Sequence, residues 1–527
     1  MDLLQLLKVY RQPFHFPFVL GEIKYNMKQL ITPLLCLLSI PVFGQMVHLD
    51  PNFGSAGIAI TPNTSEINRV ATDPDGFIFS MGYSLESGSI GVYHLTVTKH
   101  TSSGTLLPGF GTNGVVTTAI EYSEFPLDIK LQPDGKILVC GSAYLGPTQS
   151  GPGDYNSFVI RYKTNGEPDS SFALNGILKL PHPDSHLTSM MILNDGSILL
   201  AGNSYGAATI TKINSNGVVA SSFGNNGSVF LSDANFRFIL WEAIVLSENN
   251  ILCVGFDAND PDNSKLAYCK VDLNGNFIQA FGQNGKVVMD LHNTMPQIEE
   301  FLTMAKESAS GEVFIGGQSS GAIILKMNPA DGSLYTNFGN NGILHHSFPF
   351  ADMEIQADGK FLIGGSHPVT DYNAGFSITR LNSDGSLDLS FNGTGTFTAD
   401  ISPGNDYLQT LEVIAPDQIL VGGSSPLSGS NSDFMLVKIL SGGNLSVNES
   451  MQKEIAVYPN PFSDEVFFSI PEGELAEVKL VDAAGRTITT LKTGENKLSL
   501  GHLSKGIYQL VFTELTGETS FKSIVKH

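Results

Sequence analysis

The chain has 527 residues and is acidic, with a formal net charge of −22 at pH 7. Nucleic acids and anionic membrane surfaces would be repelled by this charge, which argues against both as partners. The 55 glycines and the low share of charged residues, 15%, indicate a turn-rich β protein.

The chain begins with a segment that we interpret as an export signal preceded by a mis-assigned start. Residues 1–26 have mixed charge and no clear pattern, whereas residues 27–44 combine the basic Lys28 with an apolar run from Leu30 to Phe43. This is the pattern of a signal peptide, and its apolar core is too short to span a membrane comfortably. No other apolar run approaches the required length, so we expect no transmembrane segment in the mature protein.

A strand–turn–strand pattern then organises most of the chain. In residues 127–142, LDIKLQPDGKILVCGS, apolar and polar residues alternate up to the turn Pro133-Asp134-Gly135. Alternation of period two indicates a strand with one buried face, and the turn sequence indicates a tight hairpin. The following run, Ile137 to Cys140, is apolar on both faces and predicts a strand packed between neighbours, which Gly141 is expected to end.

Seven copies of this hairpin follow one another at intervals of about 56 residues. Each is preceded by an aromatic residue and a small residue, as in Phe110-Gly111, and is followed by an alternating strand that ends in a glycine turn, as in 158–166. We expect the alternating strand to be the outer one of four in each unit. All-β repeats of this length are typical of a β-propeller, so the sequence predicts an all-β, seven-bladed propeller over residues 45–443. The segment 49–54 resembles the end of a unit, so we expect it to complete the last blade.

The repeat resembles the delta-60 repeat of bacterial secreted proteins. The matching patterns are Ser386 to Gly395 and Gln356 to Gly365, and the resemblance covers roughly residues 49–443. It implies an architecture and no particular activity. The fourth, fifth and seventh units depart from the Pro-Asp-Gly turn, at Glu248-Asn249-Asn250, Ser310-Gly311 and Pro416-Asp417-Gln418.

The mature chain keeps three cysteines, an odd number that excludes a full disulfide framework. Cys253 and Cys269 are expected on neighbouring strands, where one disulfide is geometrically possible. We favour the alternative that these two and Cys140 are buried as small apolar residues.

Residues 444–454 read as a polar linker, and residues 455–527 as a small β-sandwich of about seven short strands. This module resembles the type A C-terminal sorting domain of the type IX secretion system. The matching residues are Tyr458, Pro459, Asn460, Pro461, Phe462, Gly485, Arg486, Gly506, Tyr508, Lys522 and Lys526. The resemblance implies a partnership with the type IX machinery, a Gram-negative source, and attachment to surface lipopolysaccharide or release.

Two polar stretches are weak candidates for metal sites. His182, Asp184 and His186 lie in a segment that we expect to be a loop between two strands of the third blade, and these residue types suit zinc. Asp257, Asp260 and Asp262 offer calcium-type oxygen ligands in a hairpin loop but lack the spacing of an EF-hand. We favour plain turns in both, and thus no metal or other cofactor. No known catalytic motif is present, so we assign no catalytic residue.

Two classes of function stay open. The first is a secreted or cell-surface binding module that holds an unknown glycan or protein through loops such as 144–156, 257–265 and 367–373. The second is an extracellular propeller enzyme, a lyase or hydrolase, with carboxylates or histidines at the channel mouth. The absence of a single-copy acid–base constellation favours the binding module.

Overall fold

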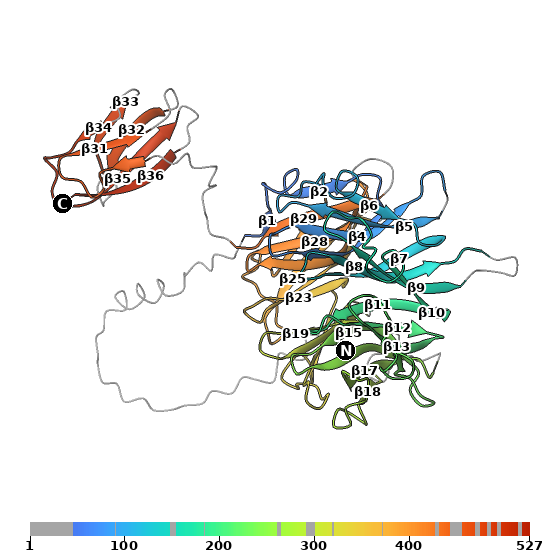
Figure 1. The fold of residues 1–527 in the computed structure, drawn as a ribbon. Coiled ribbons are helices and arrows are strands. Elements are labelled where there is room, and N and C mark those ends of the chain that lie inside the picture. The colour runs from blue at the N-terminus through green and yellow to red at the C-terminus, as the bar shows by residue number, and fades with distance from the viewer. Residues whose placement is uncertain are drawn as a thin grey trace, which may run out of the picture. The chain divides into compact units, whose positions relative to one another are not determined.

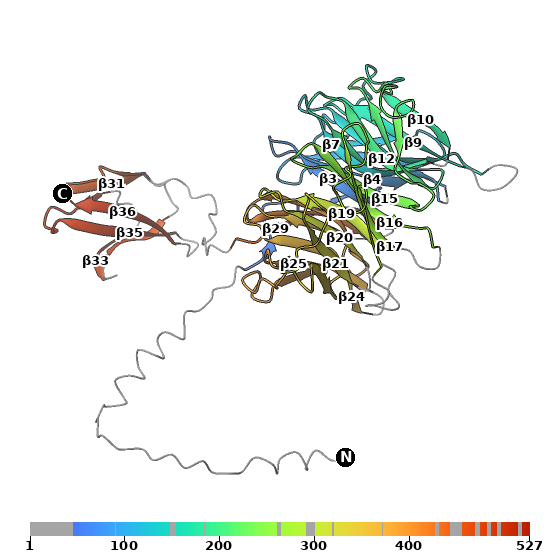
Figure 2. The same cartoon turned by 90° about the horizontal axis from the view of Figure 1, so that it is seen from below.

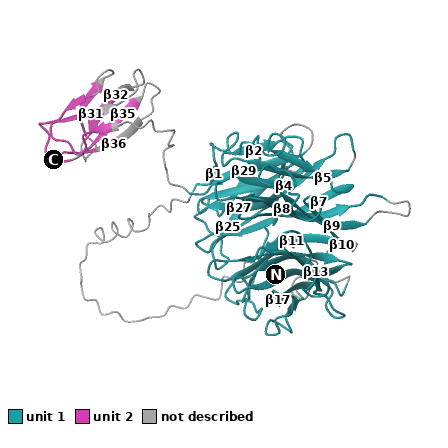
Figure 3. Cartoon of the chain, in the orientation of Figure 1, with its two compact units in different colours: residues 1–443 teal, residues 444–527 magenta. Residues whose placement is uncertain are grey.

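The computed structural model describes residues 46–442 and 456–526, apart from short gaps at 90, 148–153, 184, 261–264, 291–300, 319–320, 371–372, 427–431, 470–474, 482–485, 493–496 and 515–518. The extension predicted at 1–26, the signal peptide at 27–44 and the linker at 444–454 lie outside the described residues. Every described element is a β-strand, and the described part has no helix that could cross a membrane. The chain divides into two compact units, residues 1–443 and 444–527 (Figure 3).

In the first unit, the described residues form seven sheets (Figure 1). The first sheet holds β3 (Glu66–Thr72), β4 (Ile78–Leu85), β5 (Tyr93–His100) and β6 (Val115–Thr118). The second holds β7 (Ser123–Leu131), β8 (Ile137–Tyr144), β9 (Tyr155–Tyr162) and β10 (Ile177–Pro183). The third holds β11 (Ser185–Ile192), β12 (Ile198–Ser204), β13 (Ala207–Ile213) and β14 (Ser228–Phe230). The fourth holds β15 (Phe238–Val245), β16 (Asn250–Asp257), β17 (Lys265–Asp272) and β18 (Lys286–Met289).

The remaining sheets follow the same antiparallel order. The fifth holds β19 (Phe301–Glu307), β20 (Val313–Gln318), β21 (Ala322–Met327) and β22 (Ile343–His346). The sixth holds β23 (Asp352–Ile355), β24 (Phe361–Thr370), β25 (Asn373–Leu381) and β26 (Thr396–Ala399). The seventh holds β27 (Tyr407–Ala415), β28 (Gln418–Ser425) and β29 (Asp433–Leu440), joined by β1 (His48–Leu49) and β2 (Ile58–Thr61) from the start of the unit.

The first strands of the sheets form a ring. Each of β3, β7, β11, β15, β19 and β23 contacts the next in this series, β23 contacts β27, and β27 contacts β3. The hydrophobic core is divided accordingly, because each cluster of buried side chains lies between two consecutive sheets; one joins Val139 and Ile160 to Phe79 and Val97, for example. This is the arrangement of a β-propeller.

The N-terminal strands complete the last sheet, as the sequence predicted. Ile58 to Thr61 pair antiparallel with Val437 to Phe434, and His48 and Leu49 extend the same edge. Figure 1 shows the labelled β1, in blue, beside β29, in orange, and Figure 2 shows the same unit from below. Strand β29 would otherwise expose a row of unpaired N–H and C=O groups, so this pairing removes a free edge.

The predicted hairpin turns are present, including the three that depart from Pro-Asp-Gly. Gly135 has φ of 78° and donates its N–H to Gln132 O at 2.9 Å. In the fourth unit Asn249 takes the glycine position with φ of 61°, which asparagine tolerates better than most residues. The turns at 310–311 and 416–417 also join paired strands.

Two expectations about the strands were wrong. The alternating strand of each unit, such as β9, is third in its sheet. The outermost strand is the short one that follows the aromatic and small residues, as β10 follows Phe172-Ala173 and pairs with β9. Strand β9 is buried over most of its length because strands flank it on both sides. Gly141 does not end its strand, since β8 continues to Tyr144. A Cβ at Gly141 would lie 2.3 Å from Phe125 O, so glycine is needed there for close approach of the neighbouring backbone.

An Asp that lies three residues before the Phe of the repeat, as Asp388 does before Phe391, is a structural anchor. Asp388 accepts hydrogen bonds from Arg380 Nε at 2.7 Å and Lys360 Nζ at 2.8 Å, so it ties the hairpin turn to the third strand. Asp169 holds Arg161 and Lys136 in the same way. Burial alone would raise the pKa of Asp169, but hydrogen bonds from Ser171 and the nearby Arg161 and Lys136 charges lower it to about 2.

The expectation that the three cysteines are buried is confirmed. Cys140, Cys253 and Cys269 are fully buried free thiols, and Cys253 lies directly opposite Cys269 on the adjacent strand.

In the second unit, seven described strands form two sheets around one hydrophobic cluster. One sheet holds β30 (Ala456–Tyr458), β31 (Glu465–Ser469) and β34 (Lys497–Ser499). The other holds β33 (Thr487–Lys492), β32 (Leu475–Val481), β35 (Gly506–Glu514) and β36 (Thr519–Lys526). The shared core includes Phe462, Val466, Leu510 and Ile524.

Removing the N-terminal strands should destabilise the first unit as a whole. A mature chain that begins at residue 63 leaves the outer edge of β29 unpaired, so we expect a clearly lower melting temperature and concentration-dependent association. Circular dichroism melts and size-exclusion chromatography against the chain that begins at residue 45 measure both. Equal melting curves would contradict a ring that depends on this closure.

Replacing Asp388 by Asn should lower the free energy of unfolding by about 3 kcal/mol at pH 7, because Arg380 and Lys360 lose a buried partner charge. The pKa of Asp388 is lowered in the fold, since the bonds from Lys360 and Ser390 and the Arg380 charge outweigh burial, so its stabilisation is present above pH 4 and is lost as the pH falls through the folded-state pKa. The loss in Asp388→Asn should therefore shrink at pH 2 to 3 in urea titrations. The exposed turn residue Asp384, changed to Asn, is the control and should cost under about 1 kcal/mol.

Candidate functional site

A repeated backbone irregularity shapes the centre of the ring. In six of the seven first strands the pairing register shifts by one residue, which leaves Asn68, Leu127, Thr188, Trp241, Thr303 and Gln409 without a direct partner. Such β-bulges bend a strand and redirect a side chain. The glycine of the second strand, as at Gly255, allows the bulged backbone to approach, because a Cβ there would lie 2.0 Å from Ile239 O.

The bulges bring side chains from separate sheets to one opening, which we call the mouth. It is a cavity of about 270 Å³ lined by Arg69, Leu127, Thr188, Trp241, Thr303, Gln318, Phe350, Ala351 and Gln409. Trp241 is the single tryptophan of the chain and is 43% exposed. An aromatic ring beside amide, hydroxyl and guanidinium groups can stack on a ligand and hydrogen-bond to it.

Arg69 also lines a second cavity of about 360 Å³, the channel interior. Its charged lining consists of Arg69, Asp128, Lys130, Glu242, Lys306, Asp352, Glu354 and Glu412. These residues come from the first strands of six sheets, so a set far apart in the sequence converges on one space.

One layer of the interior carboxylates serves the scaffold. Asp128 accepts the N–H of Met190 at 2.9 Å, Glu242 that of Ala305 at 2.7 Å, and Asp352 that of Leu411 at 2.8 Å. Each bond runs from one sheet to a later neighbour in the ring. These carboxylates therefore bind consecutive sheets together through backbone donors.

The channel interior also holds an ionic cluster around Lys306. Lys306 Nζ lies 2.6 Å from Glu354 Oε1. Burial raises the pKa of Glu354 to about 7, helped by the Asp352 charge and opposed by Lys306. Burial also raises the pKa of Glu242 and of Glu412, although Thr72 donates to Glu412 Oε1 at 2.7 Å. The pKa of Lys306 is raised too, because its carboxylate neighbours outweigh the effect of burial.

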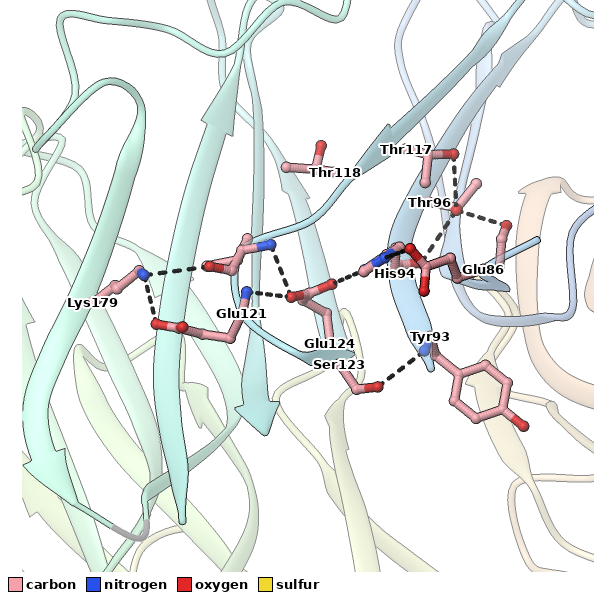
Figure 4. A network of polar contacts seen from close by, with 12 residues as sticks. Glu86, Tyr93, His94, Thr96, Thr117, Thr118, Glu121, Ser123, Glu124 and Lys179 are labelled. Carbon is pink, nitrogen blue, oxygen red and sulfur yellow. Dashed lines mark hydrogen bonds and ion pairs between the residues drawn. The ribbon is translucent and has the colours of Figure 1, made fainter. Parts of the chain in front are cut away.

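A further polar network lies between the first and second sheets (Figure 4). The buried Glu124 accepts the N–H groups of Ile120 at 2.8 Å and Glu121 at 2.6 Å, and it pairs with His94 Nδ1 at 2.9 Å. Just before the seventh sheet begins, Asp406 accepts the N–H groups of Ile401 and Ser402 in the same way. The network fixes the turn before a first strand, so we assign it a structural role.

The proposed zinc ligands are not arranged as expected. His182 lies on β10 and His186 on β11, so they belong to strands of two different sheets and not to a loop within one blade; the loop prediction was wrong. Asp184 and the side chain of His182 lie outside the described residues. His186 Nδ1 lies 2.9 Å from Ser142 Oγ, and its ring contacts Tyr155.

The calcium candidates are only partly described. Asp257 ends β16, is buried, and accepts from Asn259 N at 3.3 Å, so it stabilises its own turn. Asp260 is exposed and Asp262 lies outside the described residues. Over the described ranges, no three His, Cys, Asp or Glu side chains come together as a metal site would require.

In the second unit, part of the sorting motif packs on the last strand. Asn460 Oδ1 accepts the N–H of Val525 at 2.9 Å, and Phe462 N donates to Val525 O at 2.8 Å. Lys526 Nζ lies 5.4 Å from the centre of the buried Phe462 ring, and Gly506 pairs with Lys526. Tyr458, Pro459 and Pro461 are exposed, Tyr508 Oη donates to Ser504 O, Lys522 lies on β36, Arg486 is exposed, and Gly485 lies outside the described residues.

Sequence reasoning missed the mouth and the interior cluster. A signal was available in the glycines inside strands, such as Gly141, Gly202 and Gly255, because an interior glycine often marks a bulge opposite it. Which residues converge could not be predicted from the sequence, since they come from several sheets, and Phe350 and Ala351 lie outside the strands.

Comparison with protein families confirms both resemblances. Residues 456–526 match the secretion system C-terminal sorting domain, and residues 132–172 and 356–391 match a β-propeller domain of unknown function, DUF5122. The matched propeller segments are the two that contain the Lys136–Arg161–Asp169 and Lys360–Arg380–Asp388 sets. The chain thus carries a β-propeller domain and a type IX sorting domain, which implies handling by that machinery and a secreted or cell-surface location.

No curated protein matches the chain. Among solved structures, it is similar to a protein of unknown function from Dyadobacter fermentans, with 11% identity, a TM-score of 0.44 and coverage of 74% of this chain and 100% of that one. It is also similar to the β-propeller domain of the Trilobed protease from Pyrococcus furiosus, with 8% identity, a TM-score of 0.34 and coverage of 70% and 95%. Similarity at this level says nothing about activity.

Replacing Lys306 by Met should destabilise the protein more at pH 8 than at pH 5. Glu354 has a folded-state pKa above its unfolded value, so the fold binds its proton more tightly and stability falls as the pH rises from about 4.5 to 7. Without Lys306 this pKa rises further, and we expect a loss of about 2 kcal/mol at pH 8, between the values for exposed and buried pairs.

Urea denaturation of both proteins at pH 5 and pH 8 measures this difference. Lys163→Met, which breaks the exposed pair with Glu167, is the matched control and should leave stability nearly unchanged at either pH. An equal loss of stability at pH 5 and pH 8 for Lys306→Met would contradict a direct charge interaction between Lys306 and Glu354.

Proposed function

We propose that this protein is a type IX-exported, non-enzymatic binding protein whose seven-bladed propeller, residues 45–443, holds a ligand at the mouth. The seven sheets in cyclic contact support the blade number, and the two sheets around one core support a β-sandwich at 455–527. In this proposal residues 27–44 direct export, residues 444–454 act as a linker, and the mature protein is attached to surface lipopolysaccharide or released.

The exposed Trp241 at the mouth carries the proposal. The repeat buries its large aromatic side chains, such as Phe110, Phe172 and Phe281, between sheets. Trp241 instead occupies a bulge position, and the bulge turns it toward an opening where Thr188, Thr303 and Gln409 also lie. A large aromatic ring kept in solvent beside polar groups is the usual composition of a recognition site.

The charged interior supports binding over catalysis. Glu242 is held by a backbone N–H, Glu412 by Thr72, Lys130 by Asp128 and Lys306 by Glu354. Groups that are already paired with the scaffold are poorly placed to act on a substrate. They also bind neighbouring sheets together, which explains their presence without any reaction.

An extracellular polysaccharide lyase or hydrolase is the alternative. Glu354 favours it, because a carboxyl group with a pKa of about 7 is suited to general acid or base catalysis near neutral pH. Incubation with polysaccharides and assay of new reducing or unsaturated ends tests this function. New ends that disappear in Glu354→Gln would establish the enzyme and overturn the binding proposal.

Ligand binding at the mouth should change the emission of Trp241, which is the chain's only tryptophan and so reports on this site alone. Titration of the mature protein with oligosaccharides and peptides should give a saturable change for at least one of them. Gln409→Ala should weaken that binding by about tenfold, since a site loses roughly 1.4 kcal/mol with one hydrogen bond. A compound that binds by calorimetry without changing the emission would contradict binding at the mouth.

A further inference from the structure

A row of aromatic rings crosses the first three sheets on the face where the first strands begin. Tyr83 and Tyr93 are 5.1 Å apart between ring centres, and both contact Phe125 at 6.5 Å. Phe125 contacts Tyr155 at 6.2 Å. We call the set the aromatic row; its full membership is Tyr83, Tyr93, Phe125, Tyr144, Tyr155, Tyr122 and His186.

The aromatic row is a surface feature. Tyr122 is 45% exposed, and the other six members are partly exposed, whereas the aromatic side chains between the sheets are almost completely buried. Leu85 and Leu145, next to the row, are exposed as well. Five members lie near the ends of strands β4, β5, β7, β8 and β9. The row is therefore built by strands of more than one sheet.

Single aromatic residues hold positions of the row in other sheets: Phe301 and Tyr407 correspond to Phe125, and Phe256 corresponds to Tyr83. Over the described residues, the tyrosine pair Tyr144 and Tyr155 is not repeated in the fourth and seventh sheets. The positions that correspond to Tyr144 and Tyr155, at the end of the second strand and the start of the third, hold Asp257 and Lys265 in the fourth sheet and Ser425 and Asp433 in the seventh. A scaffold requirement would recur in every unit, as the hairpin turns and the core phenylalanines do. The scaffold therefore does not require the tyrosine pair, which favours a function specific to this part of the face.

The aromatic row is connected to the mouth. Tyr83 Oη donates to Glu66 Oε2 at 2.6 Å, and Gln409, which lines the mouth, donates to the other oxygen of the same carboxylate. Phe125 lies two residues before Leu127, another residue of the mouth lining. Row and mouth thus lie on the same face.

We propose that the aromatic row binds an uncharged polysaccharide chain; the proposal rests on the binding function above and names its ligand class. Tyrosine combines an apolar ring face, which packs on the C–H face of a sugar, with a hydroxyl that hydrogen-bonds to sugar hydroxyls. A series of such rings matches the repeating units of a linear glycan. The neighbouring Glu66, Glu86 and Glu121 and the net charge of −22 repel polyanions, which favours an uncharged polymer.

Affinity electrophoresis of the full mature protein tests the proposal. Native gels would contain a β-glucan, a mannan or a xylan as uncharged probes, alginate as a polyanion, or chitosan as a polycation. We expect at least one uncharged polysaccharide to retard the protein, and Tyr93→Ser combined with Tyr155→Ser to weaken this retardation at least tenfold. Tyr155→Phe should keep most of the affinity because it retains the ring.

Tyr335→Ser is the matched control. Tyr335 is 37% exposed, but it lies in the loop that follows β21, on the opposite face, so its replacement should leave binding unchanged. Thermal melts of every variant show that a loss of binding is not a loss of folding.

The outcomes separate the row from the mouth. Binding that Trp241→Ala abolishes and the double tyrosine variant leaves intact would overturn the row while supporting the mouth. Retardation by chitosan or alginate alone, or by no polysaccharide at all, would overturn the proposed ligand class, whereas a saturable Trp241 response to another compound would still support the binding function.

Discussion

The ring of first strands is the constraint on which the rest of the first unit depends. Seven sheets meet at this ring, and it closes because the N-terminal strand β2 pairs with β29 at the far end of the unit. Each hydrophobic cluster lies between two sheets, so no sheet has a core of its own. A gap in the ring would expose one such cluster and one sheet edge together, which links the packing of every sheet to the pairing of two short strands.

The same ring determines where chemistry can occur. The bulges and the strand glycines opposite them allow the first strands to bend, and this bending directs Trp241 and its neighbours to the mouth. Behind the mouth, Asp128, Glu242 and Asp352 accept backbone N–H groups of neighbouring sheets. The channel interior is therefore charged for a structural reason, and the variable residues at the mouth and in the aromatic row are the ones left for recognition.

The two kinds of acidic residue in the repeat have different physical roles. The turn residues Asp134, Asp195 and Asp358 accept from the backbone of their own hairpins and are exposed. Asp169 and Asp388 are buried and hold an arginine and a lysine of the same unit. The family match covers these two complete sets, so what the family model recognises here is the scaffold, and it carries no information on the ligand.

The local structure, the repeat and the sorting module could all be predicted from the sequence alone. Turns, alternating strands and interior apolar runs depend on residues that are neighbours in the sequence. The turn at Pro133-Asp134-Gly135 and the buried strand from Ile137 to Cys140 could therefore be predicted without knowledge of the fold. The sorting module was readable because its motifs are contiguous. The order of the strands could not be predicted, since β9 alternates like an edge strand yet pairs with a strand on each side.

Which side chains meet depends on how the sheets pack, and this could not be predicted from the sequence. Lys306 and Glu354, or Phe125 and Tyr155, lie on different strands, and their contact depends on the angle and register at which the sheets pack around the ring. His182 and His186 show the reverse, because two residues close in sequence lie on strands of different sheets. Sequence spacing predicts a site only where one secondary-structure element supplies all of its residues. Here the residues of each candidate site come from several sheets of the ring.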